Sequence, residues 1–437
     1  MTYWNVMSST ETGVHISARW SAERSAYRPP CTPDPSAVEE NAALIATHLE
    51  AAGTLRAAFG WYMRAAAWLT KRDIGAARGM WLRARDVADQ LPDDDDDRTS
   101  MRIAPRTLLC GYVWCVGGAS IAETGLDELR ELSEATGDDV SLVLGMSGVL
   151  VAMTLNHRFE DLQVLASDYV RRLDSIGDRA LTVGLLNTVT HGKFDAGESI
   201  ETLHLAGRVI ELAGGDATLG SFFFESPLAW AITLRRLANC SLGQSGWCDD
   251  LRVGLAMAHS AGGMTQAAVT TYGYGVTMLN CVLVPDTTVL EHTADALASA
   301  ERVGNDVSVA WARVIHGIVL VRKHVRDRAT GLELVARGRQ QALRHGDLLT
   351  VTMADIQMAE CKACDGDTAG AIEIAAATVK HLSDCGIVSF RGPATRPDTA
   401  TIAIVIAPWR HRLASRDISR WHRRCLDGTH AVGRKNP

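Results

Sequence analysis

Apolar and polar positions along residues 287–305 follow the period of an α-helix. Leu290, Ala294 and Leu297 recur at spacings of four and three residues, so they share one helical face, while charged and hydroxyl side chains take the opposite face. Gly304 follows the last residue of this pattern, at a position where helices commonly end in a left-handed conformation. The pattern predicts one amphipathic helix that ends at a glycine.

The same glycine stop returns along most of the chain. It falls at Gly137, Gly177, Gly215, Gly263, Gly304, Gly346 and Gly386, at intervals of 40, 38, 48, 41, 42 and 40 residues. Asp or Asn follows five of these seven glycines and can cap the next helix. A recurring interval of this size is typical of helical hairpins that stack into an array.

Residues 54–91 carry the spacing of a tetratricopeptide unit, in helices predicted over 54–70 and 73–91. The matching residues are Trp61, Ala65 and Trp68 in the first helix and Ala77 and Trp81 in the second. In such units, small residues let two helices cross closely and large ones fill the space beside them. We therefore predict an all-α fold, a tetratricopeptide-like helical-hairpin solenoid with a right-handed superhelix.

Changes in composition divide the chain into four segments. Residues 1–35 have no period and carry four prolines near their C-terminal end, at 29, 30, 33 and 35, which predicts a disordered or loosely ordered leader. Residues 36–92 are the predicted N-terminal tetratricopeptide-like helices, and residues 98–390 are the predicted helical-repeat array. Residues 391–437 form an irregular basic tail. The five aspartates at 93–97 are interpreted as a solvated acidic loop, because a calcium loop would alternate its ligands with other residues.

Within the predicted array, each unit pairs an apolar helix with an amphipathic one. The predicted helix 307–320 is apolar nearly all round and precedes the amphipathic helix 331–344, and the predicted helices 348–359 and 368–383 repeat this order. A helix that is apolar on every side must be covered on every side. We expect the first helices to form an interior layer, the second helices an outer wall, and the array to have a concave surface.

Three aromatic residues recur near the repeat period and form the best candidate site. Trp230, Tyr272 and Trp311 are 42 and 39 residues apart, which predicts similar places on successive first helices. If they face the concave surface, they form a stripe for a partner peptide or a flat ligand. The alternative, which we favour, is that they fill space between repeats. The polar candidates beside this stripe are Arg235, His316 and Asp355.

The composition indicates the cellular environment of the protein more clearly than its function. Hydrophobic residues make up 47% of the chain, and a net charge of −7 gives no general attraction to nucleic acid or anionic membranes. The longest uncharged apolar stretch, residues 140–155, is shorter than a bilayer requires, so no membrane attachment is expected. Ten cysteines without a framework spacing indicate reduced thiols in a cytoplasmic protein.

No residue pattern indicates a catalytic chemistry. The sequence has no G-x-x-x-x-G-K-[ST] loop for phosphates, and Ser147 and Ser245 miss the G-x-S-x-G pattern by one position. Cys361 and Cys364 have the spacing of half a zinc site or a redox pair, but no second pair follows, so packing thiols are favoured. We expect no enzyme activity, no cofactor and no metal.

Four stretches carry a resemblance to a known family. They are HLEAAGTLRAAFGWYMRAAAWLTKRDIGAARGMWLRARDVADQLPDDD (48–95), RIAPRTLLCG (102–111), GDRALTVGL (177–185) and SPLAWAITLRRLA (226–238). Over residues 37–390 the chain resembles the C-terminal tetratricopeptide-like region of actinobacterial, especially mycobacterial, adenylate or guanylate cyclases and signal-transducing P-loop ATPase regulators. Some members of that family end in a LuxR-type DNA-binding domain. The resemblance covers the repeat region only, because this sequence carries none of the family's cyclase or ATPase motifs.

Three functional hypotheses follow from the sequence. The first is a non-catalytic helical-repeat interaction module of a bacterial signalling or transcriptional regulator, whose protein partner is a separately encoded cyclase or ATPase. The second is a sensor that binds a small molecule on its concave face. The third is a nucleic-acid-binding regulator that acts through residues 391–437, and we disfavour it because the tail lacks two clearly spaced helices.

Overall fold

The structure, a computed structural model, describes residues 35–70, 72–116, 120–323, 325–387 and 390. The predicted leader, apart from Pro35, lies outside these residues, and so does the predicted basic tail at 391–437. The structure therefore does not bear on the nucleic-acid hypothesis, which rests on the tail.

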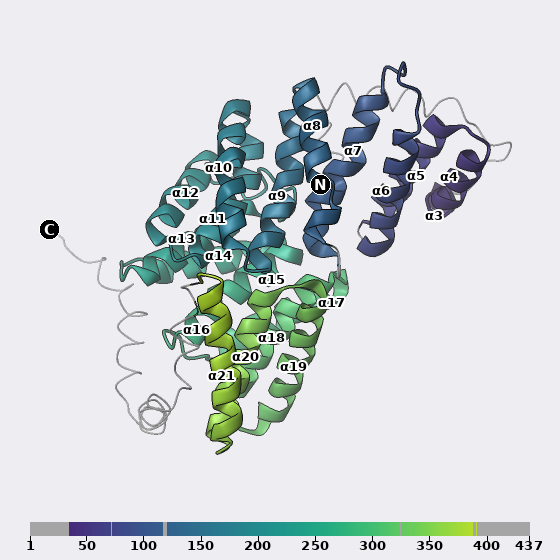
Figure 1. Cartoon of the computed structure of the whole chain (residues 1–437). Helices are drawn as coiled ribbons and strands as arrows, with labels where there is room; N and C mark the ends of the chain where they lie inside the picture. Colours follow the sequence, from purple (N-terminus) through teal and green to yellow (C-terminus); the bar gives the residue numbers. More distant parts are fainter. Residues whose placement is uncertain (1–34, 71, 117–119, 324, 388–389, 391–437) are drawn as a thin grey trace.

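The described residues form helices joined by short connections, with no β-strand among them, which confirms the all-α prediction (Figure 1). The N-terminal helices are α3 (Pro35–Glu40), α4 (Ala42–Ala51), α5 (Leu55–Leu69), α6 (Ile74–Asp89), α7 (Arg98–Gly111) and α8 (Leu126–Thr136). The short 3₁₀ turns are η1 (Val113–Cys115), η2 (Ile121–Glu123) and η4 (Val325–Asp327).

The helices from α9 onward pack as neighbouring pairs, and we call them the paired array. Its first helices are α9 (Asp139–Leu155), α11 (Arg179–Asp195), α13 (Pro227–Ser241), α15 (Gly263–Thr270), α18 (Asp306–Lys323) and α20 (Leu348–Cys364). The helix α15 continues through the π-helix η3 (Thr271–Val276) into α16 (Thr277–Leu279). The second helices are α10 (Phe159–Ile176), α12 (Ser199–Ala213), α14 (Trp247–Ala261), α17 (Thr287–Val303), α19 (Arg328–His345) and α21 (Thr368–Asp384).

The first helices form the inner layer of the paired array, as predicted. Each of them packs against the next first helix as well as against its own partner. Burial runs along nearly the whole of α9, whereas α10 buries one face, made by Phe159, Leu162, Ala166, Tyr169 and Leu173. An apolar helix is stable only when every side is covered, so the uniformly apolar sequence of α9 determines its place in the interior.

The glycine stops have the predicted backbone conformation. All seven adopt positive φ, with Gly304 at +75°. Gly137, Gly177, Gly304 and Gly346 are left-handed residues that end their helices, as predicted. Gly215 and Gly386 instead follow the capping residue, and Gly263 is the first residue of α15. At Asp138, Asp178 and Asp347, the side chain after the glycine accepts a hydrogen bond from the backbone N–H three residues on. The helices around these stops run longer than predicted: the helix expected over 307–320 spans Asp306–Lys323.

The N-terminal helices have a core of their own. Ala65 and Ala77 are buried where α5 and α6 pack together, and the Trp81 ring lies 5.3 Å from that of Tyr112, which follows α7. In the loop at 93–97, Asp93, Asp94 and Asp96 are exposed, as expected of a solvated loop, while Arg56 on α5 binds the carboxylates of Asp95 and Asp97.

One pair of helices crosses unusually closely. A Cβ placed on Gly317 of α18 would lie 2.6 Å from the carbonyl oxygen of Gly331 on α19, and one on Gly331 would lie 2.7 Å from that of Gly317. Real Cβ atoms do not approach an oxygen so closely, so glycine is required on both helices at this crossing.

The two ends of the paired array meet, which the sequence did not predict. His157, in the turn between α9 and α10, makes a ring-to-ring hydrogen bond of 2.9 Å with His381 on α21, although 224 residues separate them. Gly346, between α19 and α20, lies against Asn156 of the same turn. In Figure 1 the green and yellow helices α17 to α21 accordingly pack beneath the blue and teal helices. We call this contact the closure.

We predict opposite effects for Gly304→Ala and Gly79→Ala. Neither position has an atom within 4 Å of an added Cβ, so the two substitutions differ in backbone conformation and not in space. Gly304→Ala forces alanine into positive φ and should destabilise the fold by about 1 kcal/mol. Gly79→Ala, inside α6, should stabilise it by about 0.5 to 1 kcal/mol. Urea unfolding measures both, and equal shifts would contradict the assignment of Gly304 as a left-handed stop.

We predict that the closure makes stability depend on pH. Burial, with a smaller effect from His381, lowers the pKa of His157 from 6.5 to about 3. The unfolded chain then binds a proton at a higher pH than the folded chain, so stability is complete above pH 6.5 and is lost as the pH falls. The wild type should lose about 2 kcal/mol more than His157→Gln between pH 7 and pH 5.

Urea unfolding across this pH range provides the measurement. His204→Gln is the matched control, because the His204 side chain on α12 is 72% exposed. It should leave the pH dependence of the wild type unchanged. Parallel pH profiles for the wild type and His157→Gln would show that the closure carries no such dependence.

Candidate functional site

The three predicted aromatic residues are buried and do not line an open concave surface. Trp230, Tyr272 and Trp311 are 2%, 1% and 3% exposed. The rings of Trp230 and Tyr272 touch edge to face, with centroids 5.0 Å apart. Their burial contradicts the hypothesis of a stripe open to a ligand, and their surroundings match the alternative that we favoured, in which large residues fill space between repeats. The physical reason is the close approach of successive first helices, which covers the rings from both sides.

A buried polar network surrounds these rings. The His191 ring on α11 is hydrogen-bonded to the Tyr272 hydroxyl, and its Nε2 atom lies 3.2 Å from the Asp195 carboxylate. Burial raises the pKa of Tyr272, and the nearby carboxylates of Asp195 and Asp347 raise it further. Tyr272 therefore stays neutral at physiological pH. Because all these side chains are buried, the network joins α11 to η3 through the middle of the array and is not exposed to a substrate.

Trp311 makes a hydrogen bond to the residue that caps α20, the next first helix. Its indole Nε1 donates a hydrogen bond of 2.6 Å to Asp347, which also accepts from the backbone N–H and the hydroxyl of Thr350. Burial raises the pKa of Asp347, and the hydrogen bonds from Thr350 and Trp311 oppose that rise. Trp311 thus links α18 to the N-terminal cap of α20.

The three polar candidates each bind a neighbouring second helix. Arg235 makes a two-point ion pair with Asp250 on α14, at 2.6 and 2.9 Å. The His316 ring is 3.0 Å from the Thr293 hydroxyl on α17, and Asp355 is paired with Arg339 on α19. The structure therefore does not bring these three together with the aromatic rings into one site.

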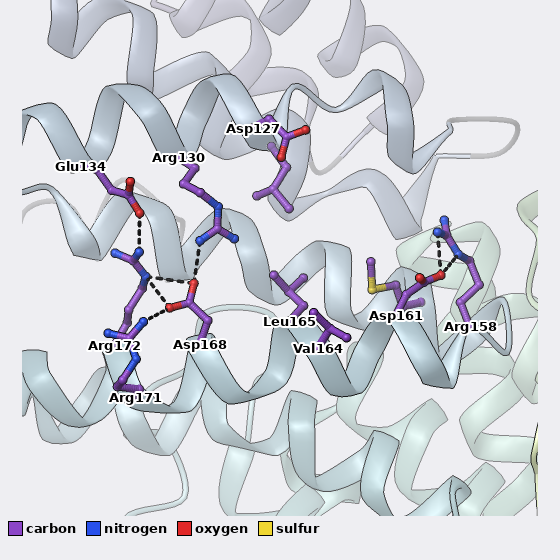
Figure 2. A pocket seen from close by; sticks show the side chains of 12 residues that line it. Asp127, Arg130, Glu134, Arg158, Asp161, Val164, Leu165, Asp168, Arg171 and Arg172 are labelled. Atoms are coloured by element: carbon purple, nitrogen blue, oxygen red, sulfur yellow. Dashed lines mark hydrogen bonds and ion pairs between the residues drawn. The ribbon is translucent and has the colours of Figure 1, made fainter.

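The described surface does contain an open groove, between α8 and α10, which the sequence analysis did not single out (Figure 2). Its volume is about 700 Å³. Its lining residues are Leu126, Asp127, Arg130, Glu134, Met153, Arg158, Asp161, Val164, Leu165, Asp168, Arg171 and Arg172. Met153 belongs to α9, so a first helix contributes to the groove between two others.

The middle of the groove is apolar and its two ends are charged. In Figure 2, Val164 and Leu165 lie between the ion pair of Arg158 with Asp161 at one end and a larger ion-pair cluster at the other. Val164 is 80% exposed, which is unusual for a valine on a helix with a well-buried apolar face. A sequence signal existed, because Val164 falls outside the three-to-four spacing of the buried α10 residues.

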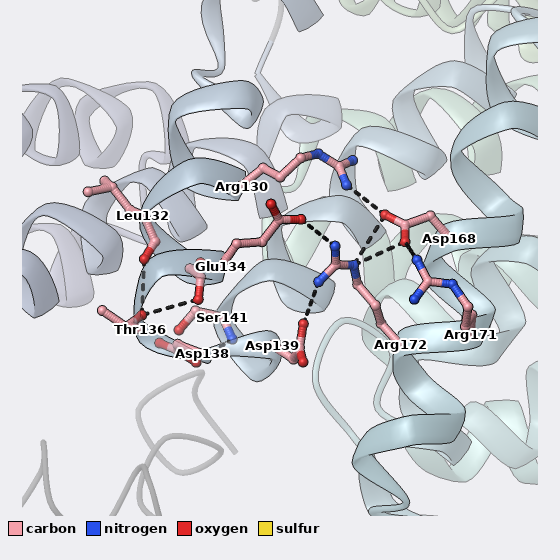
Figure 3. Close-up of polar contacts among 11 residues, drawn as sticks. Arg130, Leu132, Glu134, Thr136, Asp138, Asp139, Ser141, Asp168, Arg171 and Arg172 are labelled. Carbon is pink, nitrogen blue, oxygen red and sulfur yellow. Dashed lines mark hydrogen bonds and ion pairs between the residues drawn. The ribbon is translucent and has the colours of Figure 1, made fainter.

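The larger ion-pair cluster joins three helices (Figure 3). Arg172 on α10 binds Glu134 on α8 and Asp139 on α9, each at 2.5 Å, and it also binds Asp168. Arg130 on α8 binds Asp168 at 2.6 Å. Partial burial on its own raises the pKa of Asp168, but the hydrogen bonds from Arg130 and Arg172 outweigh it and lower that pKa. The cluster therefore joins the two walls of the groove through the ionised carboxylate of Asp168.

The described residues contain neither a metal-binding cluster nor a helix that could cross a membrane. No group of three His, Cys, Asp or Glu side chains in this part of the chain is arranged to hold a metal ion. Among the described helices, none combines the length and apolar character that crossing a bilayer requires. Among the described residues, the thiols of Cys110, Cys115, Cys240, Cys361, Cys364 and Cys385 are free.

Comparison with known proteins assigns the chain to no family. No family model matches the sequence, and no curated protein matches it.

We predict that Trp311→Ala destabilises the fold by about 3 to 5 kcal/mol, because it removes a buried ring and a donor to the buried Asp347 carboxylate. Trp68→Ala is the matched control, since Trp68 is half-buried beneath Arg72, and it should cost less than about 2 kcal/mol. Amide hydrogen exchange should show the loss of protection first in α18 and α20. Unchanged exchange in these two helices would contradict the role assigned to Trp311.

Proposed function

We propose that the chain is a non-catalytic helical-repeat interaction module that binds a protein partner through the groove between α8 and α10. The groove, with its exposed Val164, is the observation that carries the proposal. In this reading the paired array is a tetratricopeptide-like right-handed solenoid within a bacterial signalling or transcriptional regulator. The proposed partner is a separately encoded cyclase or ATPase, by resemblance to regulators in which those domains accompany such repeats.

The shape of the groove favours a polypeptide over a small molecule. Sites for small molecules are mostly concave pockets that bury most of the ligand surface. This groove is instead open along two helices, which suits an element that lies along it. The small-molecule hypothesis depended on an exposed aromatic stripe, and the burial of Trp230, Tyr272 and Trp311 removes that support.

The pattern of the groove specifies the kind of element it would accept. The apolar middle around Val164 and Leu165 fits one or two apolar side chains on a single face of an amphipathic helix. The ion-pair clusters at the two ends present both arginine and carboxylate groups, so they match a partner segment with charged residues of both signs flanking its apolar residues.

We predict that Val164→Arg weakens the binding of groove-directed peptides. Helical peptides selected from a displayed random library against the wild-type chain should bind Val164→Arg at least tenfold more weakly, because a large charged side chain fills the apolar middle. Stability should change by no more than about 0.5 kcal/mol, since the position is exposed. Fluorescence anisotropy with labelled peptides measures the affinity.

Ile200→Arg is the matched control. Ile200 is 75% exposed on α12 and does not line the groove, so this variant should bind the selected peptides like the wild type. Peptides that bind Val164→Arg unchanged would place the interaction elsewhere and reject the groove. Hydrolysis or cyclisation of ATP or GTP by the purified chain would reject the non-catalytic assignment.

A further inference from the structure

Arg236 on α13 is a buried cation that has no carboxylate partner among the described residues. It is 0% exposed. Its Nε and Nη1 atoms make no hydrogen bond there, and its Nη2 atom donates one long bond of 3.3 Å to the Thr277 hydroxyl. A guanidinium taken out of water normally keeps ionic or hydrogen-bonding partners, because unpaired burial is costly. The arrangement therefore calls for an explanation.

Another buried arginine of the same chain shows the usual solution. Arg106 has a side chain that is only 3% exposed, and it binds Asp89 at 2.7 Å and Glu128 at 2.8 Å. Arg236 has a carboxylate nearby, that of Asp250, but Arg235 already binds it at two points. Burial lowers the pKa of Arg236 to about 10, so the group still carries its positive charge at neutral pH.

The guanidinium makes a cation–π contact with a ring at the start of α14. Its Cζ atom is 5.3 Å from the centre of the ring of Trp247, the first residue of that helix. The capping residue before it, Gly246, has no side chain to accept a hydrogen bond from the first turn. A helix N-terminus carries partial positive charge, so two sources of positive potential meet here.

The groups around the guanidinium include the thiols of Cys240 and Cys248, and none of these groups accepts a hydrogen bond from Nε or Nη1. The Thr277 hydroxyl donates to backbone carbonyls of η3, so towards Arg236 it serves only as an acceptor. The Tyr274 hydroxyl is hydrogen-bonded to His292 at 2.7 Å, and the Asp249 side chain points largely into solvent, being 66% exposed. What remains are N–H donors on a planar cation, which suit an oxyanion.

We propose that Arg236 and the N-terminus of α14 form a binding site for a small oxyanion, a carboxylate or a phosphate, covered by the indole of Trp247. The unpartnered Nε and Nη1 atoms lie on different edges of the guanidinium, so the oxyanion takes one edge and a second Nη2 hydrogen completes a two-point contact. The oxyanion enters from the side of Trp247, which is half-buried and follows the exposed turn at 242–246. This site is separate from the groove between α8 and α10 and does not depend on the function proposed for it.

The test is a titration of the full chain followed by NMR of the tryptophan indole N–H groups, with the Trp247 signal identified from Trp247→Phe. Sodium phosphate and sodium acetate are added in separate arms, at an ionic strength held constant with sodium chloride. We expect a saturable shift of the Trp247 signal. A tighter response to phosphate identifies a phosphate source, and a tighter response to acetate identifies a carboxylate such as that of a peptide.

Three variants separate binding from structure. Arg236→Met should lose the saturable shift and, without an oxyanion, should unfold at a temperature no lower than the wild type, because a buried unpaired cation is replaced by an apolar chain. Arg236→Lys keeps the positive charge but lacks the paired N–H donors of the guanidinium, so it should bind the oxyanion at least tenfold more weakly. This variant replaces Arg236→Met in the test if the methionine variant does not fold. Arg339→Met, which breaks the ion pair with Asp355 on α19, should keep the full titration.

Two results would overturn the site. One is a wild-type chain whose Trp247 signal shows no saturable response to either phosphate or acetate. The other is a response that persists unchanged in Arg236→Met and Arg236→Lys, as expected from a general salt effect on the whole protein.

Discussion

Close contact between helices with small residues at their crossings is the constraint on which the rest of this structure depends. A Cβ on Gly148 of α9 would lie 2.1 Å from the carbonyl oxygen of Gly111 on α7, and the crossing of α18 with α19 requires Gly317 and Gly331. Crossings this close exclude water from the space between the helices. Close packing likewise leaves no open concave surface around Trp230 and Tyr272, which are both buried.

Exclusion of water determines how the polar side chains in the interior behave. Asp347 is stable there because Trp311 and Thr350 donate to it, and Arg106 because two carboxylates bind it. Polar groups with such partners act as links between helices that are distant in sequence. Arg236 lacks such partners, and for that reason it stands out as a site for a ligand and not as another link.

Because the interior of the array is filled, the candidate partner site lies on its outside. At α8 and α10 the ion-pair cluster of Arg130, Asp168 and Arg172 holds two helices apart above α9. The space that this spacing creates is lined by Val164, an apolar side chain that the fold leaves uncovered. The fold thus combines a rigid support with an exposed apolar contact, which is the arrangement expected of a protein-binding surface.

The sequence by itself determined the local features of this protein. Helix type, the order of apolar and amphipathic helices and the positive φ of Gly304 all follow from periods of three to four residues and from the conformational preference of glycine. Each of these depends on residues close together in the chain, so a linear pattern contains the necessary information. The burial of the first helices was predictable for the same reason.

Tertiary structure alone decided which distant side chains meet. The closure joins His157 to His381, and the groove combines α8, α9 and α10. The sequence showed Trp230, Tyr272 and Trp311 at regular spacing, but whether they faced a ligand or one another depended on how closely the first helices pack. The isolation of Arg236 likewise depends on Asp250 being bound by Arg235. Such contacts depend on long-range packing and on competition between neighbouring charges, and neither produces a repeating pattern in the sequence.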